Sequence, residues 1–277
     1  VGSEMCIRDR GKTMKNKIVV LFTALALTGI SCQAAMVIPN SIASEITSYG
    51  YNADESGCLK AAQDGNVYVL NLFTQVNAYV NMHDADGRTP VYLAASKGKV
   101  KAVKYLLLCG ANINARTENM KSPLMAAIEA KSFETAKLLI DARASLNVAD
   151  ENGYTPLHYA IMHDQIGIAQ YMVTLFCDID APDNFGNTPL FYAVNKGEQY
   201  IQVLLNAGAD RNAKNYDGKT PLHKAVMSNN FNMVRFLIEN GVNLNIADKE
   251  GKTPISYAKP HSEIYNLLIE SGAKAPD

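Results

Sequence analysis

The sequence predicts an all-α fold, a solenoid of about seven helix-turn-helix repeats joined by β-turn fingers. Three observations predict it. A Thr-Pro or Ser-Pro pair recurs about every 33 residues, an Ala stands four residues after each Pro, and an apolar pair follows about sixteen residues after most of them. The prolines that set this register are Pro90, Pro123, Pro156, Pro189, Pro221 and Pro254. A unit of this length cannot bury its apolar face alone, so the units are expected to stack.

Each repeated position has a structural role. An Asp and a Gly three residues apart, as at Asp150 and Gly153, are typical of a turn, because Asp bonds its own backbone and Gly accepts a positive φ. The following Thr155 and Pro156 favour the start of a helix, with Thr as the cap and Pro at the first helical position. The recurring Ala allows a second helix to approach closely, and the apolar pair faces the first helix and the neighbouring repeat.

Two copies carry a more specific motif. Thr155–Ala160 and Thr220–Ala225 both read Thr-Pro-Leu-His-x-Ala, and with the 33-residue period this resembles the ankyrin repeat over about residues 57–276. The resemblance implies an ankyrin-repeat solenoid that binds proteins and performs no catalysis. It also implies that His158 and His223 form hydrogen bonds within and between the turns rather than binding a metal.

Five positions depart from the pattern. The first repeat begins near Cys58 without a Thr-Pro pair, and Pro260 interrupts the first helix of the last repeat; atypical ends are expected of a solenoid. Met120 replaces a turn Gly, so that finger is expected to be distorted. Arg143 and Phe176 replace the Gly that closes the second helix. Either those helices end differently, or the third and fourth repeats are the soft part of the solenoid.

The N-terminal region lies outside the repeat register. Residues 1–13 are interpreted as an upstream tail or an artefact, because the first ten resemble the translation of a sequencing adaptor. Residues 14–34 resemble a signal peptide, with two lysines, an apolar run too short to remain as a membrane span, and small residues before the cleavage site. An alternative interpretation makes Cys32 a lipidated residue. Residues 35–56 are expected to be a linker to the repeat domain.

Composition narrows the classes of function. The 26 Lys and Arg residues nearly balance the 27 Asp and Glu residues, which argues against a nucleic-acid binder. The sequence shows no Gly-rich phosphate loop, no Ser/His/Asp arrangement and no Cys-x-x-Cys pair. We therefore expect no catalytic residue, no metal site, no cofactor and no small-molecule substrate. The cysteines of the repeats are spread along the chain, so free thiols are expected.

The resemblance also implies where a partner docks, because ankyrin repeats bind partners through the fingertips and the inner ends of the first helices. On this concave surface the candidate partner-binding residues are Arg88, Tyr154, Met162, His163, Phe185, Tyr216, Lys219, Met227 and Lys252. The aromatic residues of this set fall on three successive fingers. They form either an apolar interaction strip, since aromatic residues dominate interface energetics, or packing contacts between fingers.

These observations predict an interaction module exported to the periplasm or secreted, which acts on a protein of the cell's own envelope or on a host protein. A structural spacer anchored in the envelope through a lipid on Cys32 is the alternative from a different class. We expect the chain to be a monomer, and the identity of its partner does not follow from the sequence.

Overall fold

The computed structural model describes residues 38–75 and 79–275. Four predicted features lie outside the described residues: the proposed artefact, the proposed signal peptide, the lipidation candidate Cys32 and the first residues of the expected linker. In the described part every regular element is a helix, which confirms the all-α prediction. The elements are α1 (Asn40–Ser48), α2 (Glu55–Asp64), α3 (Val67–Thr74), α4 (Pro90–Ser96), α5 (Val100–Leu108), α6 (Pro123–Glu129), α7 (Phe133–Asp141), α8 (Pro156–Met162), α9 (Ile166–Thr174), α10 (Pro189–Ala193), α11 (Glu198–Asn206), α12 (Pro221–Met227), α13 (Phe231–Glu239), the 3-10 helix η1 (Pro254–Tyr257) and α14 (Glu263–Glu270).

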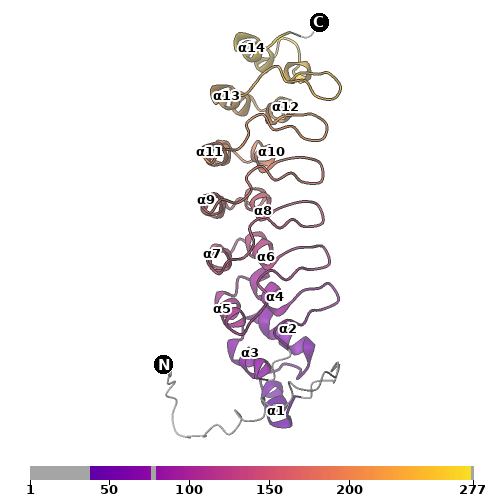
Figure 1. Ribbon diagram of the computed structural model, residues 1–277, viewed down its shortest axis with the longest axis vertical. Helices are drawn as coiled ribbons and strands as arrows, with labels where there is room; N and C mark the ends of the chain where they lie inside the picture. Colours follow the sequence, from indigo (N-terminus) through magenta and orange to yellow (C-terminus); the bar gives the residue numbers. More distant parts are fainter. Residues whose placement is uncertain (1–37, 76–78, 276–277) are drawn as a thin grey trace, which may run out of the picture. The chain divides into compact units, whose positions relative to one another are not determined.

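Within residues 38–275 these elements form seven helix pairs that stack in chain order (Figure 1). Repeat 1 is α2 with α3, repeat 2 is α4 with α5, and the series continues to repeat 7, η1 with α14. The first helices lie in one row and the second helices in another, and the loops before the first helices project on the same side (Figure 1). We call each such loop, from its Asp or equivalent to its Thr or Ser, a finger. The seven predicted repeats are therefore confirmed.

The repeated residues take the positions that the sequence analysis assigned to them. In repeats 2 to 6 the recurring Ala is fully buried, as at Ala94 and Ala160, and the first residue of each apolar pair is buried between the two rows, as at Leu106 and Leu139. Burying one such leucine stabilises the fold by roughly 1.5–3 kcal/mol. The caps also form as expected: the Thr89 side chain accepts a hydrogen bond from the backbone N–H of Tyr92. The first helices of repeats 2 to 6 are short, with seven residues or fewer.

Two ladders of hydrogen bonds join consecutive repeats. On the fingers, one backbone N–H donates to a carbonyl of the preceding finger, for example Glu151 N to Asn119 O at 3.1 Å. Behind the second helices, an Asn side-chain oxygen accepts a backbone N–H one repeat later, for example from Ser145 N to Asn114 Oδ1 at 2.9 Å. Both ladders connect nearest neighbours only, as in other solenoids.

The segment expected to be a linker differs from that expectation. Residues 40–48 form helix α1, which contacts α3. Ile46 is fully buried, and Ile42 packs half-buried against the same core. These two residues are four apart and lie on one helix face, so α1 covers the first repeat. At the other end Pro260 acts as predicted, because the first element of repeat 7 is only the short η1.

Met120 does not distort its finger, contrary to the prediction. It adopts the left-handed conformation that Gly takes in other fingers, with φ of 60°. Its N–H donates to Thr117 O at 2.9 Å, as Gly153 N donates to Asp150 O at 3.0 Å. The Thr117 hydroxyl also accepts the Lys121 N–H at 3.0 Å, so it replaces the Asp that opens other fingers. Side-chain and backbone hydrogen bonds therefore maintain the turn despite the strain of a non-glycine residue.

The helix-closing positions of repeats 3 and 4 also keep the regular geometry. Arg143 and Phe176 have φ of 70° and 57°, where Gly110 has 84° and Gly208 has 96°. Both helices therefore end as their neighbours do, with two non-glycine residues in a conformation that costs roughly 1–2 kcal/mol each.

No helix in residues 38–75 and 79–275 combines the length and apolarity that crossing a membrane requires.

Candidate functional site

In repeats 2, 4, 5 and 7 the carboxyl group of the finger's Asp accepts hydrogen bonds from the backbone of the same finger. In repeat 4, Asp150 Oδ1 accepts the N–H groups of Asn152 and Tyr154, both at 2.9 Å. In repeat 5, Asp183 Oδ1 accepts those of Phe185 and Asn187, both at 2.8 Å. Asp side chains favour such turns because they satisfy backbone donors that the short loop leaves free.

Three first-helix tyrosines attach their own fingers to the helices. The hydroxyl groups of Tyr159, Tyr192 and Tyr257 donate to the second oxygens of Asp150, Asp183 and Asp248, at 2.9, 2.6 and 2.5 Å. Burial and then the bond to the carboxylate raise the pKa values of Tyr159 and Tyr192, and the bond to Asp248 raises that of Tyr257 to about 12. Each tyrosine stands nine residues after its Asp.

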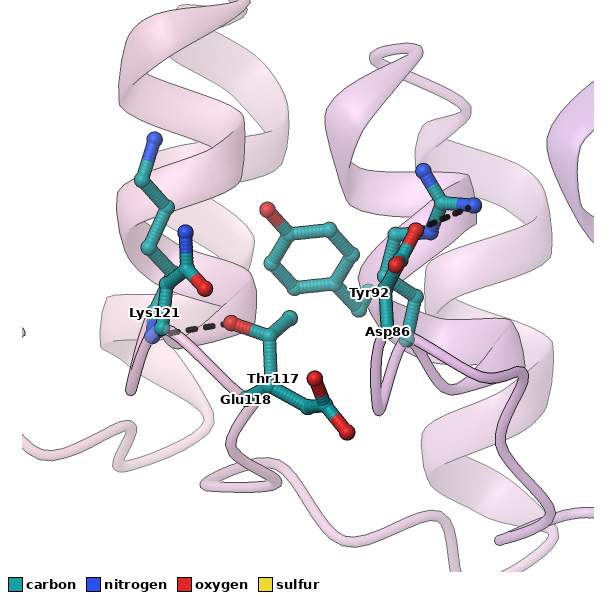
Figure 2. Close-up of a pocket in the computed structure, with 7 residues that line it drawn as sticks. Asp86, Tyr92, Thr117, Glu118 and Lys121 are labelled. Carbon is teal, nitrogen blue, oxygen red and sulfur yellow. Dashed lines mark hydrogen bonds and ion pairs between the residues drawn. The ribbon is translucent and has the colours of Figure 1, made fainter.

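A pocket of about 320 Å³ lies between the fingers of repeats 2 and 3. It is lined by Asp86, Arg88, Tyr92, Thr117, Glu118, Asn119 and Lys121. Figure 2 shows the Tyr92 ring between Lys121 on one side and Asp86 on the other, with its hydroxyl end toward the Lys121 side. Arg88 is ion-paired to Asp84 at 2.7 Å and to Asp86 at 3.0 Å, so this pocket combines both signs of charge with one aromatic ring.

A cluster of aromatic rings lies where the first helices of repeats 4 and 5 meet their fingers. The ring of Tyr154 stands edge-to-face with that of Tyr192, with centroids 5.7 Å apart and planes at 88°. Both rings also contact His158, at 5.8 and 5.6 Å. Tyr154 and Tyr192 are half-buried, so part of each ring faces solvent. We call the surface formed by the fingers and the exposed parts of the first helices the inner face.

The two motif histidines are structural, as the resemblance implied. His158 Nδ1 accepts the Thr155 N–H at 3.2 Å, and His158 Nε2 lies 3.3 Å from Asn187 O in the next finger. His223 makes the equivalent contacts to Thr220 and to Lys252 O. Because Nδ1 accepts a hydrogen bond, Nε2 carries the proton and donates it to the carbonyl. Burial lowers the pKa of both imidazoles.

The candidate partner-binding residues do not form one strip. Phe185 and Tyr216 are neighbours on two fingertips, 65% and 60% exposed, and Tyr216 N donates to Phe185 O at 2.9 Å. Met227, at the end of α12, is 50% exposed. Tyr154 instead lies below them, half-buried against Tyr192. The sequence grouped the three aromatic residues because each lies on a finger, but they occupy three different positions relative to the following Pro.

The remaining candidates lie along the inner face. His163 stacks on Tyr159 with centroids 5.7 Å apart, and Met162 O accepts a hydrogen bond from Lys196 Nζ at 2.6 Å. The cationic candidates are each paired with an acidic neighbour on their own finger. These pairs are Arg88 with Asp84, Lys219 with Asp217 at 3.7 Å and Lys252 with Glu250 at 2.8 Å. The inner face of the described part therefore carries both aromatic rings and ion pairs.

The sequence analysis missed the residues that form the inner aromatic surface, namely Tyr92, Tyr159, Tyr192 and Tyr257. A signal for three of them was present, because an Asp followed by a Tyr nine residues later recurs in repeats 4, 5 and 7.

Among the described residues, Cys58, Cys109 and Cys177 are free thiols, as expected. No group of His, Cys, Asp and Glu in the described part is arranged to hold a metal ion.

A stack of helix pairs with its exposed chemistry on the fingers defines a protein of the helical-repeat class. Residues 58–150, 143–215 and 201–276 each match the family model described as ankyrin repeats (three copies). The chain belongs to the ankyrin-repeat family. Ankyrin-repeat domains bind protein partners and are typically interaction modules rather than enzymes.

Curated relatives match this chain over short stretches. It is 38% identical over 81 residues to the E3 ubiquitin-protein ligase KEG of Arabidopsis thaliana, and 38% identical over 75 residues to a putative ankyrin repeat protein of Borreliella burgdorferi. These matches cover 28% and 27% of this chain but only 5% and 18% of the relatives. The chain thus spans a small part of the relatives that it matches.

Solved structures resemble this fold over a longer range. The ankyrin repeat domain of Bcl-3, a member of the IkappaB family, superposes with a TM-score of 0.70 and 26% identity, over 76% of this chain and 97% of that one. The ankyrin repeat domain of human ASB11 superposes with a TM-score of 0.67 over 80% of this chain and 100% of that one. At 24% identity the second likeness concerns the fold alone.

Proposed function

We propose that this chain is a non-catalytic module that binds a partner protein through its inner face, and that it acts after export. The partner-binding role is general in the family, and the surface is specific to this chain. The observation that carries the choice of surface is the pair Phe185 and Tyr216, which expose about two thirds of their surface on adjacent fingertips. Turn formation requires neither ring, and exposed aromatic residues are the commonest interface hot spots.

The position of the Tyr216 ring also favours partner binding. A Cβ atom at Gly186 would lie 2.5 Å from Tyr216 Cδ1, so one side of this ring lies against the preceding finger. A ring held on one side loses little conformational entropy on binding, which favours affinity. The finger of Tyr216 and the next finger carry the ion pairs of Lys219 and Lys252, so exposed rings and charged pairs lie on neighbouring fingers.

A photo-crosslinking experiment in the native host tests this surface. A benzophenone side chain placed at Tyr216 reports contacts of the inner face, and the same group at Phe176 is the matched control. Phe176 is 91% exposed but lies at the end of α9, away from the fingers. We expect a discrete crosslinked protein from position 216 and none from position 176. A crosslinked partner obtained only from position 176 would contradict the proposed surface.

The export part of the proposal rests on the lysines, the apolar run and the small residues of 14–34. Mass spectrometry of the N-terminus of the protein from its native host tests it. Cleavage before Ala35 is the expected result. A lipid-modified Cys32 would favour the anchored spacer, and an intact N-terminal segment would contradict export by this route.

A further inference from the structure

Comparison of the repeats reveals a regular contact between a cation and a tyrosine ring. In repeat 3, Lys121 Nζ lies 5.5 Å from the ring centroid of Tyr159 in repeat 4. In repeat 6, Lys219 Nζ lies 5.7 Å from the ring centroid of Tyr257 in repeat 7. Both lysines stand two residues before the Pro of their repeat, and both tyrosines stand three residues after the Pro of the next. The chain therefore supplies its own cation to two of these rings.

The third ring of this set, Tyr192 in repeat 5, has no such cation among the described residues. The position that would supply it is occupied by Tyr154, whose hydroxyl lies 3.3 Å from that of Tyr192. The corresponding residue of repeat 5 itself is Asn187, where repeats 2, 3, 6 and 7 carry Arg or Lys. The row of inner cations is thus interrupted at repeats 4 and 5.

Two buried acidic groups are bonded to this cluster: Asp183 to the Tyr192 hydroxyl, and Asp150 to the Tyr154 N–H and the Tyr159 hydroxyl. Asp150 is 7% exposed and Asp183 is 2% exposed. The two carboxyl groups accept hydrogen bonds from backbone N–H groups, from the Asn187 amide and from tyrosine hydroxyls. Acceptance at both oxygens is typical of the ionised form.

No lysine or arginine of the described part forms an ion pair with Asp150 or Asp183. By contrast, the equivalent Asp84 of repeat 2 has the guanidinium of Arg88 at 2.7 Å. Two lysines of the inner face form ion pairs with other carboxylates. Lys196 pairs with Asp164 at 3.0 Å, and Lys121 pairs with Glu129 at 3.2 Å. The negative charge of these two carboxyl groups therefore has no ion-pair partner within the described residues.

We propose that a basic side chain of the partner protein, arginine or lysine, occupies the exposed faces of Tyr154 and Tyr192 near Asp150 and Asp183. The partner thereby supplies the cation that the chain supplies to itself at Tyr159 and Tyr257. An electron-rich ring attracts a cation, and the attraction is stronger where water is excluded. A nearby carboxylate, which is negatively charged, also attracts the cation. This inference rests on the proposed inner-face function and specifies the chemistry that the partner brings.

The test uses two small probes that differ in charge and hardly in shape. The full 277-residue chain, with ¹³C-labelled tyrosine rings, is titrated by NMR with N-acetyl-arginine amide and, separately, with N-acetyl-citrulline amide. The ring signals of Tyr154 and Tyr192 are assigned with Tyr154→Phe and Tyr192→Phe. We expect both ring signals to shift with the arginine probe, saturating in the millimolar range, and to stay unchanged with the citrulline probe.

Tyr154→Lys is the decisive variant, because Lys121 and Lys219 show that the repeat accepts lysine at this position. It places the chain's own cation at Tyr192 and should weaken binding of the arginine probe by about fivefold or more, the size of one cation–π contact. Phe176→Ser, which changes an exposed ring after helix α9 and outside the inner face, is the control and should leave the titration unchanged. Tyr154→Phe keeps the ring and should retain binding, which guards against a folding defect.

Equal shifts with both probes would overturn the proposal, and so would an unchanged affinity in Tyr154→Lys. These outcomes are distinguishable from a failure of the proposed function. If the partner crosslinks at position 216 but binds the Tyr154→Lys variant as well as it binds the unsubstituted chain, the inner face binds the partner without a basic side chain at this site. If nothing crosslinks while the arginine probe binds, the cation site stands and the proposed function fails.

Discussion

The Thr188 hydroxyl lacks the hydrogen bond that the equivalent Thr155 hydroxyl makes with His158, because Phe191 stands in the place of the histidine. The Thr155 hydroxyl lies 3.0 Å from His158 Nδ1. At the equivalent place in repeat 5, Phe191 offers no acceptor or donor, and the buried Thr188 hydroxyl has no hydrogen-bond partner in the described part of the chain. A buried polar group without a partner costs roughly 1–3 kcal/mol.

Phe191→His should therefore stabilise the protein, by about 1 kcal/mol, because it restores the bond to Thr188 and repeats the arrangement at Thr220 and His223. Urea denaturation at pH 7.5 measures the change. Phe191→Leu is the control, since it changes ring to alkyl without adding a nitrogen. A gain of the same size with leucine would show that removing the ring, and not the hydrogen bond, is responsible.

Asp180 replaces an asparagine in the ladder behind the second helices. The equivalent residues are Asn81, Asn114, Asn147, Asn212 and Asn245. Asp180 accepts the Asp210 N–H at 3.0 Å, and burial first, then the neighbouring Asp210 and Asp178, raise its pKa. Charging this group is thus harder in the folded protein than in the unfolded one.

Asp180→Asn should stabilise the protein at neutral pH by about 0.5 kcal/mol or more, because it keeps the acceptor and removes like-charge repulsion. The sign with pH follows from the raised pKa. Asp180 opposes folding once it is ionised, and this effect disappears as the pH falls below its unfolded value of about 3.9. The gain measured by denaturation should therefore be present at pH 7 and shrink toward pH 4. A gain that is constant over this range contradicts the electrostatic explanation.

The two structural histidines should make stability depend on pH between 7.5 and 5. Burial lowers their pKa below the ordinary value of 6.5, so the unfolded chain binds the additional protons. Their contribution is complete above pH 6.5 and is lost as the pH falls through their folded-state values. Linkage makes the loss roughly 1.4 kcal/mol for each tenfold difference in proton affinity between the two states.

Denaturation at a series of pH values checks this dependence. The double variant His158→Gln, His223→Gln should be less stable at pH 7.5 and should show a flatter profile between pH 7.5 and 5. His163, whose pKa burial also lowers, remains in the variant and accounts for a residual slope. An unchanged slope in the double variant would assign the pH dependence to other groups.

Phe176→Gly should stabilise the protein by about 0.5–1 kcal/mol, the strain of a non-glycine residue at φ of 57° less the added chain entropy of glycine. The Phe176 ring is 91% exposed, so its removal forfeits almost no packing. Thermal or urea unfolding measures the effect. Phe176→Ala keeps the strained backbone and should give no gain, and an equal gain with alanine would rule out strain as the cause.

The period of the sequence was enough to predict the number of helix pairs and the place of each helix, because turn, cap, small and apolar residues recur at fixed positions. It could not predict helix α1, which precedes the register and is recognisable only by Ile42 and Ile46. It also overestimated the effect of Met120. The sequence shows that a glycine is replaced, but it does not show the compensating hydrogen bond that the Thr117 hydroxyl accepts from the Lys121 N–H.

The candidate site was predicted less completely than the fold. Arg88, Phe185 and Tyr216 could be named from the finger positions alone. The pairing of Tyr154 with Tyr192 could not, because the two lie 38 residues apart and meet only when consecutive repeats stack. The spacing of nine residues between Asp and Tyr indicates only that each such tyrosine contacts its own finger.

The ladders between neighbouring repeats have a mechanical consequence. Each junction between repeats is held by its own few hydrogen bonds, and three unfavourable features, at Phe176, Asp180 and Thr188, lie together where repeat 4 meets repeat 5. Unfolding should therefore begin in the middle of the stack, leaving two blocks that melt separately. Tyr154 and Tyr192 lie at the same junction. A partner side chain bound across the two rings would therefore stabilise the contact between repeats 4 and 5 against unfolding.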